Sequence, residues 1–203
     1  MQDEGNPQEG ARPILMKGSI VGLALMRRED VPIIARWNQD LGFTARLGTP
    51  GEVHTLEQRY QFFEQNSRWK PDGVEFAVLD LATGALIGFG GLFDITRALV
   101  GTIFIGIGEA SFRGRGCGRE ACRLICEYGF FFCNLHSIIA EVHAYNHSAI
   151  QAYEHVGFRH AGRLRGANLL NGRRYDEVIM DLVRGEFEPR HLTAFRDLEQ
   201  TPT

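Results

Sequence analysis

The 203-residue chain has no run of about 18 apolar residues, so no membrane-spanning helix is predicted from it. It also has no excess of basic charge. The formal net charge is −3, which argues against a protein that binds nucleic acid over a broad surface. The first thirteen residues have acidic side chains and no apolar segment, so no secretory signal is predicted, and a cytoplasmic protein is expected.

Cysteine is scarce, with four residues at positions 117, 122, 126 and 133. No two of them form the CxxC pair that a zinc finger requires. The spacing therefore favours neither a metal site nor a disulfide framework. We expect reduced thiols that pack in the interior of the protein.

Glycine, in contrast, is abundant, with 24 residues in the chain, about 12% where about 7% is typical. Ten of them lie between Gly84 and Gly118, where they interrupt stretches rich in Phe and Ile. This distribution is not that of a low-complexity segment. It indicates glycines that serve the backbone inside a folded core.

Hydrophobic periodicity predicts a mixed α/β sheet in a single domain at residues 14–185, with a disordered lead at 1–13 and a polar tail at 186–203. The segment 41–54 contains three glycines and Pro50, which predicts a loop. Asn171-Gly172 predicts a hairpin turn between the last two strands. Strands are expected at 20–26, 74–81, 85–93, 100–108, 137–145, 158–164 and 175–184, and helices at 30–38, 55–65, 116–132 and 146–156.

A glycine-rich segment at 112–119 lies between a buried strand and the most strongly amphipathic helix. Its glycines allow a tight turn, and the unpaired N–H groups of the helix N-terminus favour an anion. Arg113, Arg115 and Arg119 add positive charge, so a phosphate or pyrophosphate is the predicted ligand. The alternative is a tight strand-to-helix turn that holds no ligand.

Two better-known phosphate motifs do not fit this segment. The P-loop requires Lys followed by Ser or Thr, and neither dipeptide occurs in the chain. The dinucleotide fingerprint GxGxxG also fails, because the glycines here have the spacing Gly114-x-Gly116-x-Gly118.

Arg113-Gly114-Arg115-Gly116-Cys117-Gly118 resembles the R/Q-x-x-G-x-G/A loop of the GNAT superfamily of N-acetyltransferases. Three further groups of residues match the family in order. They are Glu141-Val142, then Asn146 with Ala149-Ile150, Tyr153 and Gly157-Phe158, and finally Gly162 to Arg165 with Asn171-Gly172-Arg173 and Asp176, which resemble the RimJ/RimL branch. The similarity covers residues 21–184. It implies a single-domain GNAT fold, with a mixed, mostly antiparallel central sheet flanked by helices.

This resemblance implies acetyl-CoA as cosubstrate, no metal, and an amine acceptor. The backbone amides of the loop would hold the pyrophosphate, Asn146 would bond the pantetheine arm, and the strand residues Phe104, Ile105, Gly106 and Ile107 would pair with that arm. The charge of residues 113–174 agrees with a phosphate-rich ligand, since this segment has nine Arg and four acidic residues. The implied cofactor-binding residues are Phe104, Ile105, Gly106, Ile107, Arg113, Gly114, Arg115, Gly116, Cys117, Gly118, Arg119, Asn146 and Tyr153.

Amine acetylation needs a base for the amine, stabilisation of an oxyanion, and an acid for the leaving thiolate. Glu141 is the first candidate for the base, because it lies in mid-strand where burial in a cleft would raise its pKa. A structural ion pair or a surface position is the alternative. His143 and Glu109 are weaker candidates for the same role.

Tyr153 matches the tyrosine that the family places near the thioester sulfur as a proton donor. Its alternative role is that of a core aromatic residue. Cys117, at a helix N-terminus, is a weak candidate for a nucleophile, because no histidine–acid pair accompanies it.

The acceptor is left open among protein N-termini, polyamines, amino-acid derivatives and aminoglycosides, and the chain is expected to be a monomer or homodimer. Two other functions remain: a non-catalytic CoA-binding sensor or scaffold, and a phosphate-binding protein unrelated to CoA.

Overall fold

The computed structural model describes residues 12–66 and 72–192. Within these residues, no helix is long and apolar enough to cross a membrane. The strands are β1 (Met16–Lys17), β2 (Val21–Leu25), β3 (Val74–Asp80), β4 (Leu86–Phe93), β5 (Val100–Ile107), β6 (Ser137–His143), β7 (Arg159–Leu170) and β8 (Arg173–Val183). The α-helices are α1 (Val31–Trp37), α2 (Leu41–Leu47), α3 (Leu56–Asn66), α4 (Cys117–Phe131) and α5 (His147–Val156), and the 3-10 helices are η1 (Arg28–Asp30), η2 (Ala110–Phe112) and η3 (Arg184–Glu186).

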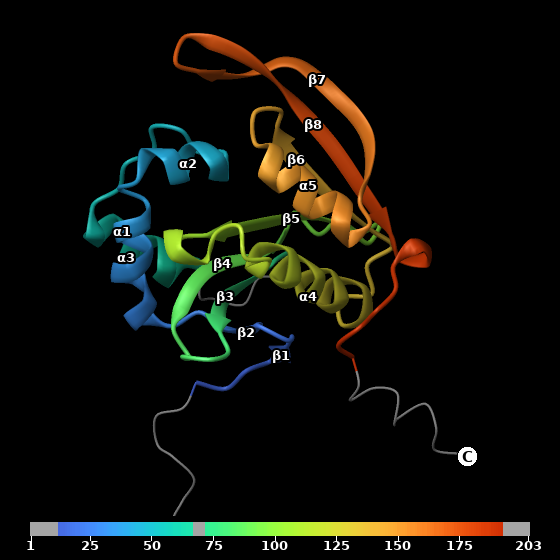
Figure 1. Cartoon of the computed structure of the whole chain (residues 1–203), viewed down its shortest axis with the longest axis horizontal. Helices are drawn as coiled ribbons and strands as arrows, with labels where there is room; N and C mark the ends of the chain where they lie inside the picture. The colour runs from blue at the N-terminus through green and yellow to red at the C-terminus, as the bar shows by residue number, and fades with distance from the viewer. Residues whose placement is uncertain (1–11, 67–71, 193–203) are drawn as a thin grey trace, which may run out of the picture.

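The strands form one eight-stranded sheet in the order β1-β2-β3-β4-β5-β6-β8-β7. Every neighbouring pair is antiparallel except β5 and β6, which are parallel. The connection between these two strands passes through α4, as parallel neighbours require. The predicted mixed, mostly antiparallel sheet in a single domain is therefore confirmed (Figure 1).

The sheet is covered on both faces. On one face α4 and α5 pack against the sheet (Figure 1), and Ile125 of α4 and Ile138 of β6 are fully buried in this larger core. On the other face, Trp37 of α1 and Phe43 of α2 pack with Phe89 of β4 in a smaller aromatic core. The elements of this second face cover only the β2–β5 half of the sheet.

The prediction of a loop at 41–54 was wrong in its first half, because residues 41–47 form α2. Asp40 caps this helix by accepting hydrogen bonds from the N–H groups of Gly42 and Phe43, and Gly48 ends it in the left-handed conformation. These are ordinary helix start and stop signals. The three glycines and Pro50 give residues 41–54 the composition of a loop, which is why the sequence predicted no helix there.

The hairpin turn at Asn171-Gly172 is confirmed. Both residues have positive φ angles, 51° and 72°, as a two-residue type I′ turn requires. The strands of this hairpin are longer than predicted, since β7 extends to Leu170 and β8 begins at Arg173. As a result the hairpin projects beyond the rest of the domain (Figure 1).

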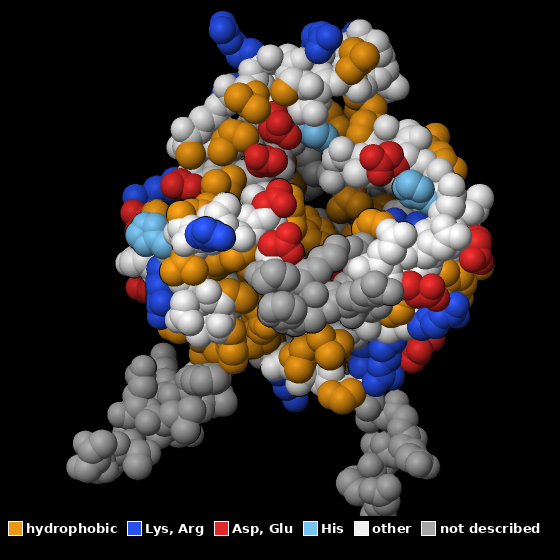
Figure 2. Space-filling model, turned by 180° about the vertical axis from the view of Figure 1, so that it is seen from behind, with side chains coloured by type: hydrophobic (Ala, Val, Ile, Leu, Met, Phe, Trp, Pro, Cys, Tyr) orange, Lys and Arg blue, Asp and Glu red, His pale blue; other side chains and the backbone are white. Residues whose placement is uncertain are grey.

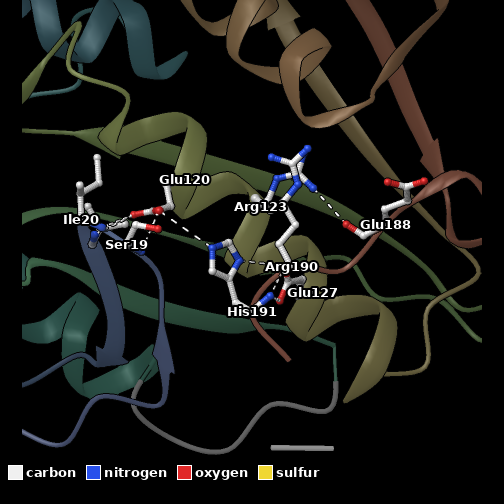
Figure 3. A network of polar contacts seen from close by, with 9 residues as sticks. Ser19, Ile20, Glu120, Arg123, Glu127, Glu188, Arg190 and His191 are labelled. Carbon is white, nitrogen blue, oxygen red and sulfur yellow. Dashed lines mark hydrogen bonds and ion pairs between the residues drawn. The ribbon is translucent and has the colours of Figure 1, made fainter. Parts of the chain in front are cut away.

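Residues 187–192, which the sequence placed in a polar tail, pack on α4 (Figure 3). The carboxylate of Glu127, which is fully buried, accepts hydrogen bonds from the backbone N–H of Arg190 and from that of His191. The His191 ring lies between Glu127, at 3.0 Å from Nδ1, and Glu120, at 4.0 Å from Nε2. Residues 193–203 lie outside the described residues.

Candidate active site

The sheet divides between its two parallel strands. β5 and β6 pair only from Val100 to Thr102 and from Ser137 to Ile139. Beyond Thr102, no described residue of β6 pairs with β5, although β5 remains paired with β4 as far as Ile107. The predicted segment Phe104–Ile107 therefore presents backbone groups along a free strand edge, which an extended ligand can use for hydrogen bonds.

The glycine loop lies at the end of this free edge and leads into α4. Gly114 and Gly116 adopt positive φ angles of 72° and 87°, and Gly116 is the N-cap of the helix. Because the first hydrogen bond of α4 runs from the N–H of Glu120 to the carbonyl of Gly116, the N–H groups of Cys117, Gly118 and Arg119 have no acceptor within the helix. This gives an anion-binding end to a helix of 15 residues.

The three arginines of the loop differ in what they contact. Arg113 donates from Nε to the carbonyl of Ile107 at 2.9 Å and from a terminal nitrogen to the carbonyl of Gly108 at 2.7 Å. It therefore fixes the loop to the end of β5, a different task from the predicted free counter-charge. The side chains of Arg115 and Arg119 are exposed and remain suited to phosphate oxygens.

Helix α2 spans the gap between the separated strands. On the β5 side, a Cβ built on Gly106 would lie 3.0 Å from Leu47 and 3.1 Å from Phe43. On the β6 side, the Tyr145 hydroxyl donates to the carbonyl of Ala45 at 2.7 Å. A pocket of about 410 Å³ lies beside α2. It is lined by Gly42, Ala45, Arg46, Tyr145, Asn146, His147, Ser148 and Leu170.

Asn146, predicted to bond the pantetheine arm, lies at the wall of this pocket and is the N-cap of α5. Its side-chain oxygen accepts from the N–H of Ala149, and its amide nitrogen donates to the carbonyl of Arg46 at 2.8 Å. The residue therefore joins α5 to α2 at the site.

Glu141 and His143 lie on the same face of β6, opposite α4 and α5. The predicted burial of Glu141 is not found, because its side chain is exposed. The side chain of His143 is only 10% exposed, and its Nδ1 is 3.8 Å from Oε1 of Glu177. On this side of the molecule, acidic side chains gather around a hollow (Figure 2).

Tyr153 is buried in α5, with its ring against Phe158 at a centroid distance of 5.1 Å. Burial, with a smaller contribution from Cys122 and Cys126, holds the pKa of the Tyr153 phenol well above its ordinary value. The phenol is therefore protonated at neutral pH, as a proton donor must be.

Cys117 and Glu109, the weaker candidates for catalytic roles, both have surroundings that favour a structural role. Cys117 is buried, and burial raises the pKa of its thiol although Arg115 opposes this effect; a raised pKa disfavours the thiolate that a nucleophile needs. Glu109 accepts a hydrogen bond from Trp37 Nε1 at 3.0 Å and forms an ion pair with Arg36. It therefore attaches α1 to the end of β5.

Residues of the C-terminal signature stabilise a bulge in the hairpin. Asp176 accepts hydrogen bonds from the N–H of Gly166 and from Arg163, and these contacts, with that of Gly166 the larger, lower the pKa of the Asp176 carboxyl. Gly166, with a φ of 61°, lies inside the register shift between Leu164 and Asn168. This signature thus determines the shape of β7.

Sequence reasoning missed α2 and Glu177 as parts of the site. The N-cap Asp40 and the following Gly48 were signals for the helix. The pairing of Glu177 with His143 comes from the register of β6 and β8, which no local pattern encodes.

Comparison with known proteins agrees with this geometry. Residues 21–159 match the model of the acetyltransferase (GNAT) domain. The probable N-acetyltransferase YjcK of Bacillus subtilis is 30% identical over 140 residues, 68% of this chain and 77% of that protein. A spermidine N(1)-acetyltransferase of Vibrio cholerae is 26% identical over 155 residues, 73% of this chain and 90% of that protein.

Solved structures have the same fold. The spermidine N-acetyltransferase of Vibrio cholerae in complex with CoA and spermine superposes with a TM-score of 0.75 at 24% identity, over 83% of this chain and 98% of that one. A GNAT-family acetyltransferase of Bacillus anthracis gives a TM-score of 0.73 at 20% identity, over 84% of this chain and 99% of that one.

The chain belongs to the GNAT family of acetyltransferases. It is accordingly an enzyme that uses an acyl-CoA donor, as the resemblance of its motifs to this family implied.

Proposed function

We propose that the protein transfers the acetyl group of acetyl-CoA to a primary amine by direct attack while both substrates are bound. The observation that carries this proposal is the separation of β5 from β6 beside the N-terminus of α4. A free strand edge that ends at an anion-binding loop matches an extended arm that ends in a pyrophosphate.

In this arrangement the loop amides from Arg115 to Arg119 hold the pyrophosphate, with Gly114 and Gly116 providing the turn. The edge from Phe104 to Ile107 binds the pantetheine arm, and the side chain of Asn146 reaches its other side. The acyl-CoA supplies an acetyl group activated as a thioester. The protein supplies orientation, a base and an acid.

Tyr153 is the proposed acid, because it matches the tyrosine that the family places near the thioester sulfur as a proton donor. The base comes from the acceptor-facing side of β6, where Glu141 and His143 are the two candidates.

For the acceptor we propose a primary amine: a polyamine, a protein N-terminus or another small amine. The names of the relatives from Vibrio cholerae support the first of these. The C-terminal residues from Gly162 to Asp176 support a position near the RimJ/RimL branch, which favours the second. The acidic surroundings of the hollow suit a cationic acceptor of either kind.

The test is release of free thiol from acetyl-CoA with a panel of amines, together with calorimetry of CoA binding. We expect CoA binding and thiol release that depends on at least one amine. Binding without release from any amine would instead support a CoA sensor or scaffold. Tyr153→Phe should lower kcat by about 10²-fold while it leaves CoA affinity nearly unchanged.

A further inference from the structure

The imidazole of His143 occupies an unusual position at the end of β6. Its side chain is nine-tenths buried, and Nδ1 is a buried atom without a hydrogen-bond partner among the described residues. Buried polar atoms in folded proteins are nearly always paired, so an exception of this kind indicates a purpose other than stability.

Glu177 lies directly behind this ring. It is the cross-strand partner of His143 in the pairing of β6 with β8, and its Oε1 is 3.8 Å from Nδ1. A carboxylate in this position favours a proton on Nδ1, which leaves the lone pair of Nε2 free to accept another. It also stabilises the imidazolium that results.

The Nε2 side of the ring faces Gly48, the residue that ends α2. A Cβ built on Gly48 would lie 3.4 Å from His143 Nε2, while Leu47 lies 3.0 Å from a Cβ built on Gly106 of β5. Two consecutive residues at the end of α2 thus approach both edges of the gap. Nε2 therefore lies beside the end of α2, the helix that also contacts the β5 segment that we assign to the pantetheine arm.

Glu141 is two residues earlier on the same face but is exposed. The charge of an exposed carboxylate can attract a cationic acceptor. The titratable residues nearest the ring are Glu177 on β8 and Tyr145, which follows β6 by two residues and packs against Tyr175 of β8. Glu141 precedes His143 on the same face of β6, and β5 has no titratable residue.

We propose that His143, oriented by Glu177, is the general base of the reaction, an inference that rests on the proposed function. The N–H bond of the acceptor ammonium breaks, its electron pair stays on nitrogen, and the proton bonds to Nε2. The amine then forms a C–N bond to the acetyl carbon, the C–S bond breaks, and the sulfur takes a proton from Tyr153. The second amine proton restores the phenol, and the imidazolium releases its proton to water.

The kinetic test compares His143→Gln, Glu177→Gln and Glu141→Gln with His155→Gln, a matched control on the exposed side of α5. Substrates are acetyl-CoA and the amine of the panel that gives the fastest thiol release. His143→Gln should lower kcat/KM by about 10²-fold or more and abolish the acid limb of its pH profile. Glu177→Gln should lower kcat with little change in the KM of the amine, and Glu141→Gln should mainly raise that KM. CoA binding by calorimetry verifies that each variant folds.

A second measurement does not depend on turnover. The ring nitrogen NMR signals of His143, assigned by their loss in His143→Gln, should show the proton on Nδ1 in the wild type and a different tautomer distribution in Glu177→Gln. An unchanged tautomer distribution would overturn the role of Glu177 as the positioning residue. If the wild type is active and His143→Gln keeps the acid limb of the pH profile, the assignment of His143 as the base is wrong, whereas the proposed function stands. If the wild type acetylates no amine, the proposed function itself fails, and the base assignment fails with it.

Discussion

The indole of Trp37 packs directly against Gly108, so closely that a Cβ built on this glycine would lie 2.0 Å from Trp37 Cδ2. Gly108 follows the last residue of β5, and Trp37 is the last residue of α1. The same indole donates to Glu109, the next residue along the chain. Because Gly108 has no side chain, α1 can pack at the end of β5, next to the free strand edge that we assign to the pantetheine arm.

Gly108→Ala should lower the free energy of unfolding by about 1–3 kcal/mol, because the rigid indole ring has to move. Urea denaturation measures this difference. Gly185→Ala is the matched control, since a Cβ there has no neighbour within 4 Å among the described residues, and it should change stability by less than about 0.5 kcal/mol. Equal effects of the two substitutions would refute the close-packing explanation.

Substitution of Arg113 and substitution of Arg119 should affect protein stability and CoA affinity differently. Arg113→Gln removes two hydrogen bonds to carbonyl groups at the end of β5, so both protein stability and CoA affinity should fall. Arg119→Gln removes an exposed charge, so CoA affinity alone should fall, by about tenfold at low salt and by less at high salt. Calorimetry at two salt concentrations, with thermal unfolding, separates these outcomes.

The charge-matched control for both is Arg97→Gln, an exposed residue in the turn before β5. It lies at the opposite end of that strand from the loop. A loss of CoA affinity in this variant as large as that in Arg119→Gln would show that only the net charge of the protein matters.

The parts of this structure that the sequence predicted are those encoded locally. The glycine loop, the helix after it and the Asn171-Gly172 turn each depend on residues within one short segment. Helix α2 has local signals too, but its seven residues are held mainly by contacts of Phe43 and Leu47 with the distant strands β4 and β5.

The surroundings of the candidate catalytic residues could not be predicted in the same way. Alternation along β6 placed Glu141 and His143 on one face, yet it could not show that one is exposed and the other buried. That difference arises because α2 covers the end of the strand, where the Cβ position of Gly48 lies 3.4 Å from His143. Likewise, the partners of Arg113 follow from how β5 ends, which the motif alone does not specify.

Asn146 combines a structural task with its proposed task in binding the cosubstrate, and two substitutions separate them. Asn146→Asp keeps an oxygen to cap α5 but loses the amide that donates to Arg46. Asn146→Ala loses both groups and should destabilise the protein by about 1 kcal/mol, whereas Asp should preserve most of the stability. Both variants should bind CoA more weakly by calorimetry. Unchanged CoA affinity in both would remove Asn146 from the cofactor site.

Glu120 should make stability depend on pH. Burial acts to raise the pKa of its carboxyl, but hydrogen bonds from the N–H groups of Ile20, Ser19 and Val21, together with His191, outweigh this effect and hold the pKa below the ordinary value of about 4.5. A group whose pKa is lower in the folded state stabilises the protein above the unfolded value. This stabilisation is lost as the pH falls from that value through the folded pKa.

The corresponding experiment follows Tm from pH 7 down to pH 3 in the wild type and in Glu120→Gln. The variant should have a lower Tm at pH 7 and a smaller decrease on acidification, because its neutral amide has no proton to gain. Glu154→Gln is the control, since this exposed carboxylate on α5 pairs with the exposed ring of His160 at 3.0 Å and accepts no backbone N–H among the described residues. If Glu120→Gln loses Tm on acidification as steeply as the wild type, the three N–H contacts do not account for the acid sensitivity.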